Sequence, residues 1–153
     1  MSSALFANQR ETNLASTIAL VEATLDELGH PAPGSRTKDA SVLCAWQIPK
    51  GSALTRVTLI HRSEFTHLRV SAMVLRIDAK LDRAALFAHL LDLNAGLCGA
   101  AFATDGDQVL LVAERSTLDL DRSEVLELIR RVTTYADEHD DVLIARFGGR
   151  RGA

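Results

Sequence analysis

Two histidines and a glutamate, His61, Glu64 and His67, lie close together in the sequence and carry side chains that can ligate a metal ion. They fall at the facing ends of two β-rich segments, so a hairpin centred on Glu64 places His61 directly opposite His67, with Cβ atoms about 5 Å apart. No fourth ligand is indicated, whereas structural zinc sites are four-coordinate. We therefore interpret the pair as a solvated cross-strand contact and expect no metal or other cofactor. A metal-binding protein is the remote alternative.

Catalytic chemistry is not indicated elsewhere in the chain. Ser116, Asp119 and His89 lack a Gly-x-Ser-x-Gly turn and have no pattern that brings them together. The glycines lack the spacing of nucleotide-binding loops. Cys44 and Cys98 lie in apolar stretches, which favours two buried thiols in a reducing compartment. We therefore expect a protein without enzymatic activity.

The composition is that of an ordinary globular protein. Its 153 residues fit one domain, with 47% hydrophobic and 24% charged residues. A net charge of -3 and a pI near 5.9 provide no attraction to phosphate backbones. No apolar run approaches the roughly 18 residues that span a bilayer, and the N-terminus lacks a signal-peptide pattern. We expect neither a nucleic-acid nor a membrane partner, and a cytoplasmic location.

The elements that position these residues follow from hydrophobic periodicity and turn residues. Helices are predicted at 13–28, from Asp82 to Gly96, and from an N-cap at Asp121 with Glu124 to Ala136. The apolar piece at 142–147 is compatible with a helical turn, a strand or a docking segment. Strands are predicted at 41–48, 53–62, 67–77, 99–104 and 108–115, the last two joined at Asp105-Gly106.

Short connections make the first three strands an antiparallel meander. We therefore predict an α+β fold: an antiparallel sheet of about five strands flanked by helices, in the order α-β-β-β-α-β-β-α. Residues 1–12 form an N-terminal arm, 13–147 a single domain and 148–153 a disordered tail.

Both faces of this sheet carry apolar side chains in the register centred on Glu64. A sheet exposed on one face should alternate apolar and polar residues, so something is expected to cover the second face. Three helices divided between the faces would do so, as would a second copy of the chain or a partner polypeptide. In the hairpin of 99–115, one face carries Ala100, Phe102, Val109 and Leu111, and the other Ala101, Leu110 and Val112.

A family resemblance rests on the block from Leu90 to Val112. Leu90, Leu93 and Asn94 form a Leu-x-x-Leu-Asn sequence that leads into a small-residue strand and a hairpin. Together with the order of elements, this block resembles the YbjN-like family and, more distantly, the chaperones of type III secretion. The resemblance implies a helix-flanked antiparallel sheet, often dimeric, that in the chaperone branch holds an extended client segment and has no catalytic residues.

The resulting prediction is a non-enzymatic, chaperone-like protein-binding domain that forms a homodimer and binds a client or effector polypeptide. The alternative is a regulatory or sensory YbjN-like domain without an extended client. Strand addition or pocket filling by a peptide would supply the affinity. The predicted protein-binding residues are apolar positions of the second and third strands: Val57, Leu59, Met73, Leu75 and Ile77.

Overall fold

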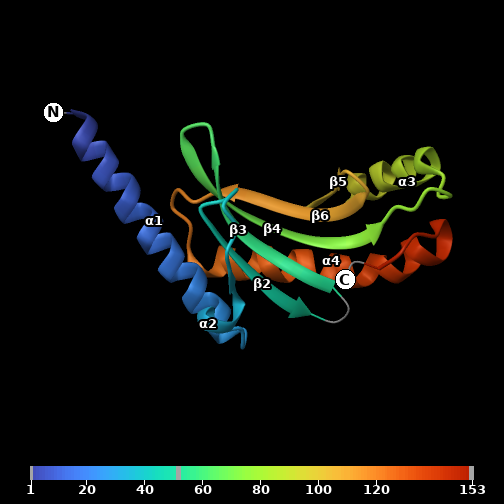
Figure 1. Cartoon of the computed structure of the whole chain (residues 1–153), viewed down its shortest axis with the longest axis horizontal. Coiled ribbons are helices and arrows are strands. Elements are labelled where there is room, and N and C mark those ends of the chain that lie inside the picture. The colour runs from blue at the N-terminus through green and yellow to red at the C-terminus, as the bar shows by residue number, and fades with distance from the viewer. Residues whose placement is uncertain (1, 51–52, 152–153) are drawn as a thin grey trace.

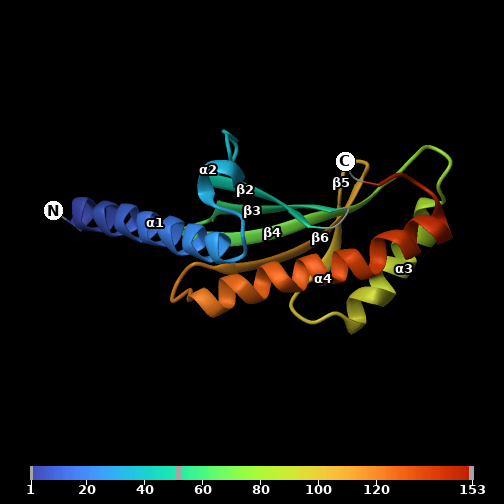
Figure 2. The same cartoon turned by 90° about the horizontal axis from the view of Figure 1, so that it is seen from below.

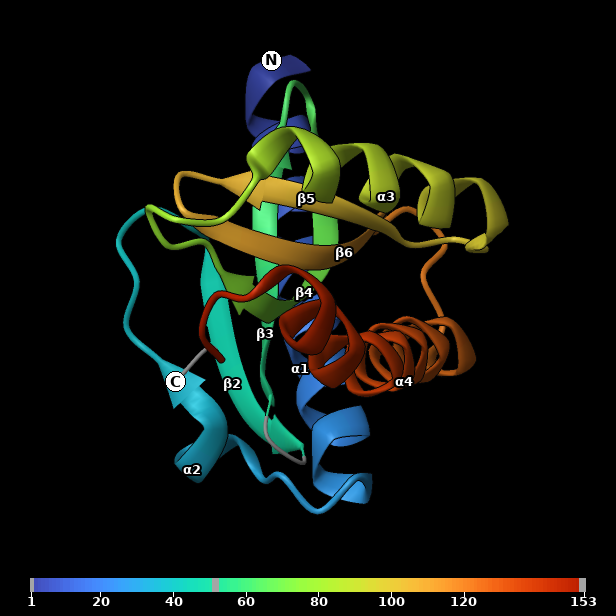
Figure 3. The same ribbon diagram turned by 90° about the vertical axis from the view of Figure 1, so that its right-hand side faces the viewer.

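The structure is a computed structural model that describes residues 2–50 and 53–151. A strongly twisted antiparallel sheet forms the centre of the molecule, and three long helices pack around it (Figures 1 and 3). The predicted α+β class is confirmed. In chain order the elements are α1 (Ser2–Glu27), α2 (Ala32–Ser35), β1 (Arg36–Thr37), β2 (Cys44–Lys50), β3 (Ala53–Arg62), β4 (Phe65–Arg76), α3 (Arg83–Gly96), β5 (Ala101–Asp105), β6 (Gln108–Ser116) and α4 (Arg122–Phe147).

The strands lie in the spatial order β1-β2-β3-β4-β6-β5, which confirms the meander of β2, β3 and β4. The sixth strand is β1, in a segment that we predicted to be a loop; it contributes only the pairs of Arg36 with Trp46 and Thr37 with Ala45. β2 starts at Cys44, later than predicted, and includes Pro49. Pro49 and Lys50, which the sequence predicts as part of a turn with Gly51, belong to β2, and residues 51–52 lie outside the described residues.

The predicted register of the β3–β4 hairpin is wrong by one residue. Arg62 pairs with Phe65, so the turn consists of Ser63 and Glu64, and Ser63 takes up a φ of 55°. Because side chains alternate along a strand, a slip of one residue exchanges the two faces. In the predicted register, buried positions of one strand lay beside exposed positions of the other. Both predicted faces of the hairpin therefore contained apolar side chains.

The helix α4 is longer than predicted. We expected it to end at Ala136, before the acidic run 137–141, but it continues to Phe147. The acidic run is compatible with the helix because Asp137, Glu138 and Asp141 are exposed, while Leu143 resumes the buried stripe one turn later. The predicted capping box of Asp121 and Glu124 is confirmed at its start.

Both ends of the predicted domain are more structured than the sequence indicated. Residues 2–12 continue α1 as one helix, where we expected a separate arm. Residues 148–151, expected to be disordered, turn back at Gly148 so that Arg150 bridges Arg76 at the end of β4. Residues 152–153 lie outside the described residues.

One face of the sheet forms the core. α4 packs along β3, β4 and β6, and α1 packs against both α4 and the same face, where Glu22 accepts a hydrogen bond from the indole of Trp46 at 3.2 Å. Figure 2 shows α1 and α4 on one side of the sheet and the short α2 on the other. The sheet residues buried under these helices include Trp46, Val57, Leu59, Leu68, Val70, Ala72, Val109 and Leu111.

Candidate functional site

The second face of the sheet divides into a polar part and an apolar part. On the β3–β4 hairpin, this face carries mainly polar side chains, such as Arg56, Ser71 and Arg69. Toward β6 and β5 it becomes apolar. Among the described residues, the short α2 is the only helix on this side, and it lies over β2 at the opposite edge. The apolar part therefore has no helix over it.

The strand registers join the apolar side chains into one surface. Met73 pairs with Leu110, which pairs with Ala103 on β5. In the next row on this face, Val112 pairs with Ala101. Such cross-strand neighbours have Cβ atoms about 5 Å apart, so the rows are continuous. All five side chains are partly or fully exposed, and we call them the open patch: Met73, Ala101, Ala103, Leu110 and Val112.

Ion pairs border the open patch. Glu114, in the row beyond Val112, accepts hydrogen bonds from Arg62 Nε at 2.9 Å and from Arg69 Nη1 at 2.9 Å. The hydrogen bond from Arg62 is the main reason why the pKa of Glu114 lies below its ordinary value, with Arg69 acting in the same direction against the effect of burial. Arg56 pairs with Asp39 toward β2. This border of the patch therefore presents charged groups of both signs.

The free edge of the sheet beside the patch is partly closed. Asn94 of α3 accepts a hydrogen bond from the Phe102 N–H at 2.7 Å and donates one to the Phe102 carbonyl at 3.2 Å. These backbone groups point away from β6 and would otherwise be free to pair with another strand. The Leu-x-x-Leu-Asn sequence thus has a structural role: Leu90 is buried, and Asn94 closes the centre of the β5 edge.

The outer side of α3 is a second exposed apolar surface. Leu91 is 69% exposed, the largest value among the exposed large hydrophobic side chains of the described residues. Phe87, Leu93 and Leu97 are partly buried. The inner side of α3 buries Leu86 and Leu90.

Of the five residues predicted to bind protein, the structure places four in the core. Val57, Leu59 and Leu75 have no exposed surface and Ile77 is 3% exposed, because they lie under the helices. Met73 points to the other face and belongs to the open patch. The remaining patch residues were not selected from the sequence. The faces predicted for the 99–115 hairpin are nevertheless confirmed, since Phe102, Val109 and Leu111 are buried and Ala101, Leu110 and Val112 lie opposite.

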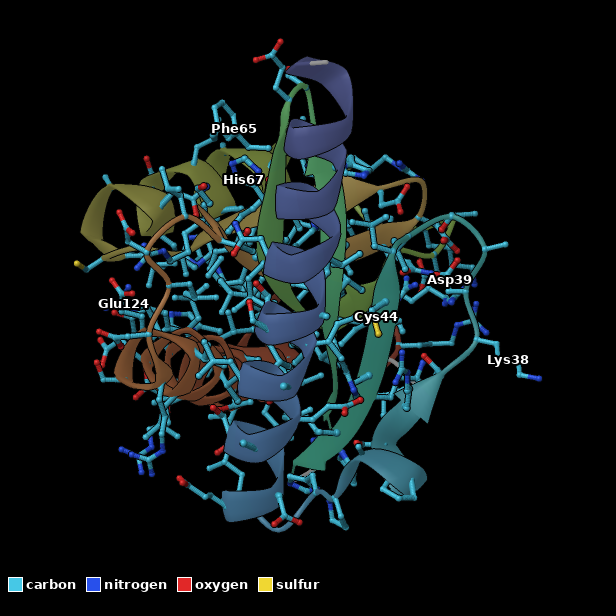
Figure 4. All side chains as sticks on the ribbon, turned by 90° about the vertical axis from the view of Figure 1, so that its left-hand side faces the viewer. Lys38, Asp39, Cys44, Phe65, His67 and Glu124 are labelled. Atoms are coloured by element: carbon cyan, nitrogen blue, oxygen red, sulfur yellow. The ribbon has the colours of Figure 1, made fainter. Side chains whose placement is uncertain are left out.

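His61 and His67 do not lie opposite each other as predicted, because the register of the β3–β4 hairpin differs by one residue from the predicted register. His61 pairs with Thr66 and His67 pairs with Ile60, so the two imidazoles lie on opposite faces. Figure 4 labels His67 near Phe65 on this hairpin. Among the described residues, no three His, Cys, Asp or Glu side chains are grouped as metal ligands would be.

A cavity of about 460 Å³ that has charged residues in its lining lies between the end of β6, the start of α4 and Gly99. Its charged groups already have partners, because Arg115 pairs with Glu124 and Arg131 pairs with Glu127. The Arg131 guanidinium also lies against Gly99, whose φ is 64°. The charges that line this cavity thus link α4 to the sheet and to the loop after α3.

Comparison with known proteins adds to this geometry. A model of the family described as T3SS (YopN, CesT) and YbjN peptide-binding chaperone 1 matches residues 15–153. The chain belongs to this family. The resemblance predicted from the Leu90–Val112 block is confirmed. A search of curated proteins finds no match.

Solved structures agree on the fold of this peptide-binding chaperone family member. A chain of "Crystal Structure of the ExsC-ExsE Complex" is 20% identical, with 84% of this chain and 94% of that chain covered and a TM-score of 0.63. A chain of "Structure of the HopA1-SchA Chaperone-Effector Complex" is 14% identical, with 86% of this chain and 97% of that chain covered and a TM-score of 0.57. A chain of "Structure of the heterodimeric complex ExoU-SpcU from the type III secretion system (T3SS) of Pseudomonas aeruginosa" is 15% identical, with 79% of this chain and 95% of that chain covered and a TM-score of 0.53. No helix in the described part of the chain is long and apolar enough to cross a membrane.

Proposed function

We propose that this chain is a non-enzymatic chaperone that holds an extended segment of a client polypeptide against the open patch. The observation that carries the proposal is the continuity of Met73, Leu110 and Ala103 across three strands, on a part of the sheet face that no helix of the described residues covers. Membership of a peptide-binding chaperone family supports it. The three similar structures are complexes of two proteins by their names, one of them a chaperone–effector complex.

The patch suits an extended segment because its rows repeat at the spacing of strands. Neighbouring strands are about 4.8 Å apart, so β4, β6 and β5 offer a surface about 10 Å wide. Alternate side chains of an extended peptide can lie on Leu110 and Val112 while the others face solvent. Each square ångström of apolar surface removed from water contributes roughly 25 cal/mol.

We also propose that the chain acts as a homodimer, with the outer side of α3 in the seam. Leu91 is the centre of this surface at 69% exposure, and a two-fold axis would bring its own copy opposite. We place the protein in the cytoplasm, where thiols such as the free Cys44 and Cys98 stay reduced.

The client proposal is tested by placing a charge in the patch. Val112→Asp should abolish recovery of a stoichiometric polypeptide partner in affinity purification from the native cell, because a carboxylate on this row cannot be desolvated without a partner. Thr134→Asp, on the exposed side of α4, introduces the same charge elsewhere and should retain the partner. A partner recovered equally with both variants contradicts the client site. A well-folded wild type with no polypeptide partner favours the regulatory or sensory alternative.

The dimer proposal has its own measurement. Leu91→Asp should convert a dimer to a monomer in sedimentation equilibrium, whereas Thr134→Asp should leave the mass unchanged. A wild-type chain that stays monomeric at every concentration contradicts the dimer and leaves the client proposal intact.

A further inference from the structure

The end of β4 has an edge that β3 does not cover. In the described residues the β3–β4 ladder ends at Thr55 and Ala72, but β4 continues to Arg76 and still pairs there with Gln108 of β6. The Arg76 N–H donates to the Arg150 carbonyl at 2.8 Å, and the Arg150 N–H donates to the Arg76 carbonyl at 3.0 Å. Arg150 thus takes the position beside β4 that a longer β3 would occupy.

A glycine is required next to this bridge. Gly149 has a φ of 91°, which strains any residue with a side chain. A methyl group at Gly149 would lie 2.7 Å from the Arg76 carbonyl oxygen and would also collide with the Leu75 side chain. The edge therefore selects its occupant by shape as well as by backbone hydrogen bonds.

Acidic groups complete the site. Arg151 forms an ion pair with Asp141 and lies 3.8 Å from a carboxylate oxygen of Asp140, both on α4. Asp140 is 5% exposed, so its carboxylate is held inside the structure rather than in solvent. Attraction between charges is less screened there than at the surface. These groups favour an arginine two residues after the glycine.

We propose that this edge of β4 is a binding site for a basic polypeptide segment of the pattern Gly-x-Arg, and that residues 149–151 occupy it as an intramolecular stand-in. Backbone pairing with Arg76 would hold the middle residue of the segment, the positive φ and the lack of space at Gly149 select glycine, and Asp140 and Asp141 select arginine. The inference rests on the proposed function for the natural occupant, a client segment that displaces residues 149–151.

Displacement is physically reasonable because the stand-in is held by few contacts. One bridge pair, the exposed ion pair with Asp141 and the longer contact with Asp140 fix it, and the Arg151 side chain is 48% exposed. Surface ion pairs contribute little to stability. The stand-in still competes with a client, since a tethered segment has an effective concentration of the order of millimolar.

The experiment uses the full chain and, as the probe, the peptide Gly-Gly-Arg-Arg-Gly-Ala, which has the sequence of residues 148–153. Gly149→Ala should open the site and speed hydrogen exchange at the Arg76 amide at least tenfold. Millimolar peptide should then restore protection and shift the Arg76 resonance. The same peptide with alanine at its second position should bind at least tenfold more weakly.

Two further variants complete the test. Gly34→Ala is the matched control, because a methyl group there meets nothing within 4 Å and φ is not positive, so it should behave as the wild type. Arg150→Pro removes the N–H that reaches Arg76 and should open the site independently; it decides the result if Gly149→Ala does not fold. The inference is overturned if, in an opened variant, neither the exchange rate nor the resonance of the Arg76 amide changes with the peptide, or if both peptides change them equally.

The outcomes separate this site from the proposed function. If the peptide binds at Arg76 but affinity purification recovers no client polypeptide, the proposed function is contradicted and the binding site at the end of β4 is still supported. A client that binds the wild type and the opened variants with equal affinity and does not perturb Arg76 contradicts the site alone.

Discussion

Asn94 of α3 hydrogen-bonds both backbone groups of Phe102 in β5, and so takes the place of a neighbouring strand at the free edge of the sheet. This single contact links the helix to the hairpin that follows it in the chain. It also limits strand addition to β5, because the centre of its edge is already paired. A client that adds a strand would have to use another edge, such as the end of β4.

Asn94→Ala should destabilise the fold by about 2 kcal/mol, because it leaves two partly buried backbone groups of Phe102 unpaired. Urea unfolding measures the loss, and hydrogen exchange should show faster exchange at the Phe102 amide. Asn94→Asp is the control: it retains the acceptor for the Phe102 N–H and should keep most of that protection. Equal exchange in both variants contradicts the role given to Asn94.

Thr55→Val should stabilise the fold by about 1 kcal/mol. Thr55 is fully buried, and its hydroxyl has no hydrogen-bond partner in the described residues, so removing the hydroxyl removes a desolvation cost. Thr58→Val is the matched control on the same strand, since the Thr58 hydroxyl donates to the Arg69 carbonyl at 3.3 Å. It should be neutral or destabilising. In thermal unfolding, the melting temperature of Thr55→Val should therefore lie above that of the wild type, and that of Thr58→Val at or below it.

Glu114→Gln should destabilise the fold by about 1 kcal/mol at pH 7, a modest value because the pairs with Arg62 and Arg69 are partly exposed. The folded pKa of Glu114 lies below its ordinary value of 4.5, so the charge stabilises the fold above that pH. This contribution is lost as the pH falls through the folded pKa, and the variant and wild type should converge in acid. A difference that stays constant with pH contradicts this account. Glu127→Gln, in an i,i+4 pair, should cost only about 0.3 to 0.5 kcal/mol.

The two thiols should react at very different rates. The expectation of two buried thiols is wrong for Cys98, which is exposed. Cys44, labelled in Figure 4, is 6% exposed, and burial raises its pKa. A thiol reagent such as DTNB should titrate one fast group in the native protein and two in denaturant, because the thiolate is the reactive form. Cys98→Ser should remove the fast group. Two fast groups in the native wild type would show that β2 is not packed as described.

The local elements of this fold could be predicted from the sequence. The Asp121–Glu124 capping box, the start of a helix at Asp82 and the Asp105-Gly106 hairpin with its two faces all depend on neighbours within a few residues. The family followed from the same kind of signal, in the block around Asn94. Such patterns are readable because each is fixed by local hydrogen bonds and by the period of the backbone.

The faces of the β3–β4 hairpin could not be predicted in the same way. The register of β3 and β4 depends on whether the turn holds two or three residues, and one residue decides which face Val57 and Met73 occupy. Likewise, α4 continues through its acidic run because Leu143, which follows that run, is buried in the core.

The sequence by itself determined the start of α4 at its capping box, the Asp105-Gly106 hairpin and the family, since these rest on short-range geometry. Only the tertiary structure decided that Leu110 and Val112 lie open, that four predicted binding residues are buried, and that Arg150 sits beside Arg76. The reason is that burial and strand order are set by contacts between segments far apart in the chain, and residue type alone does not specify which segments meet.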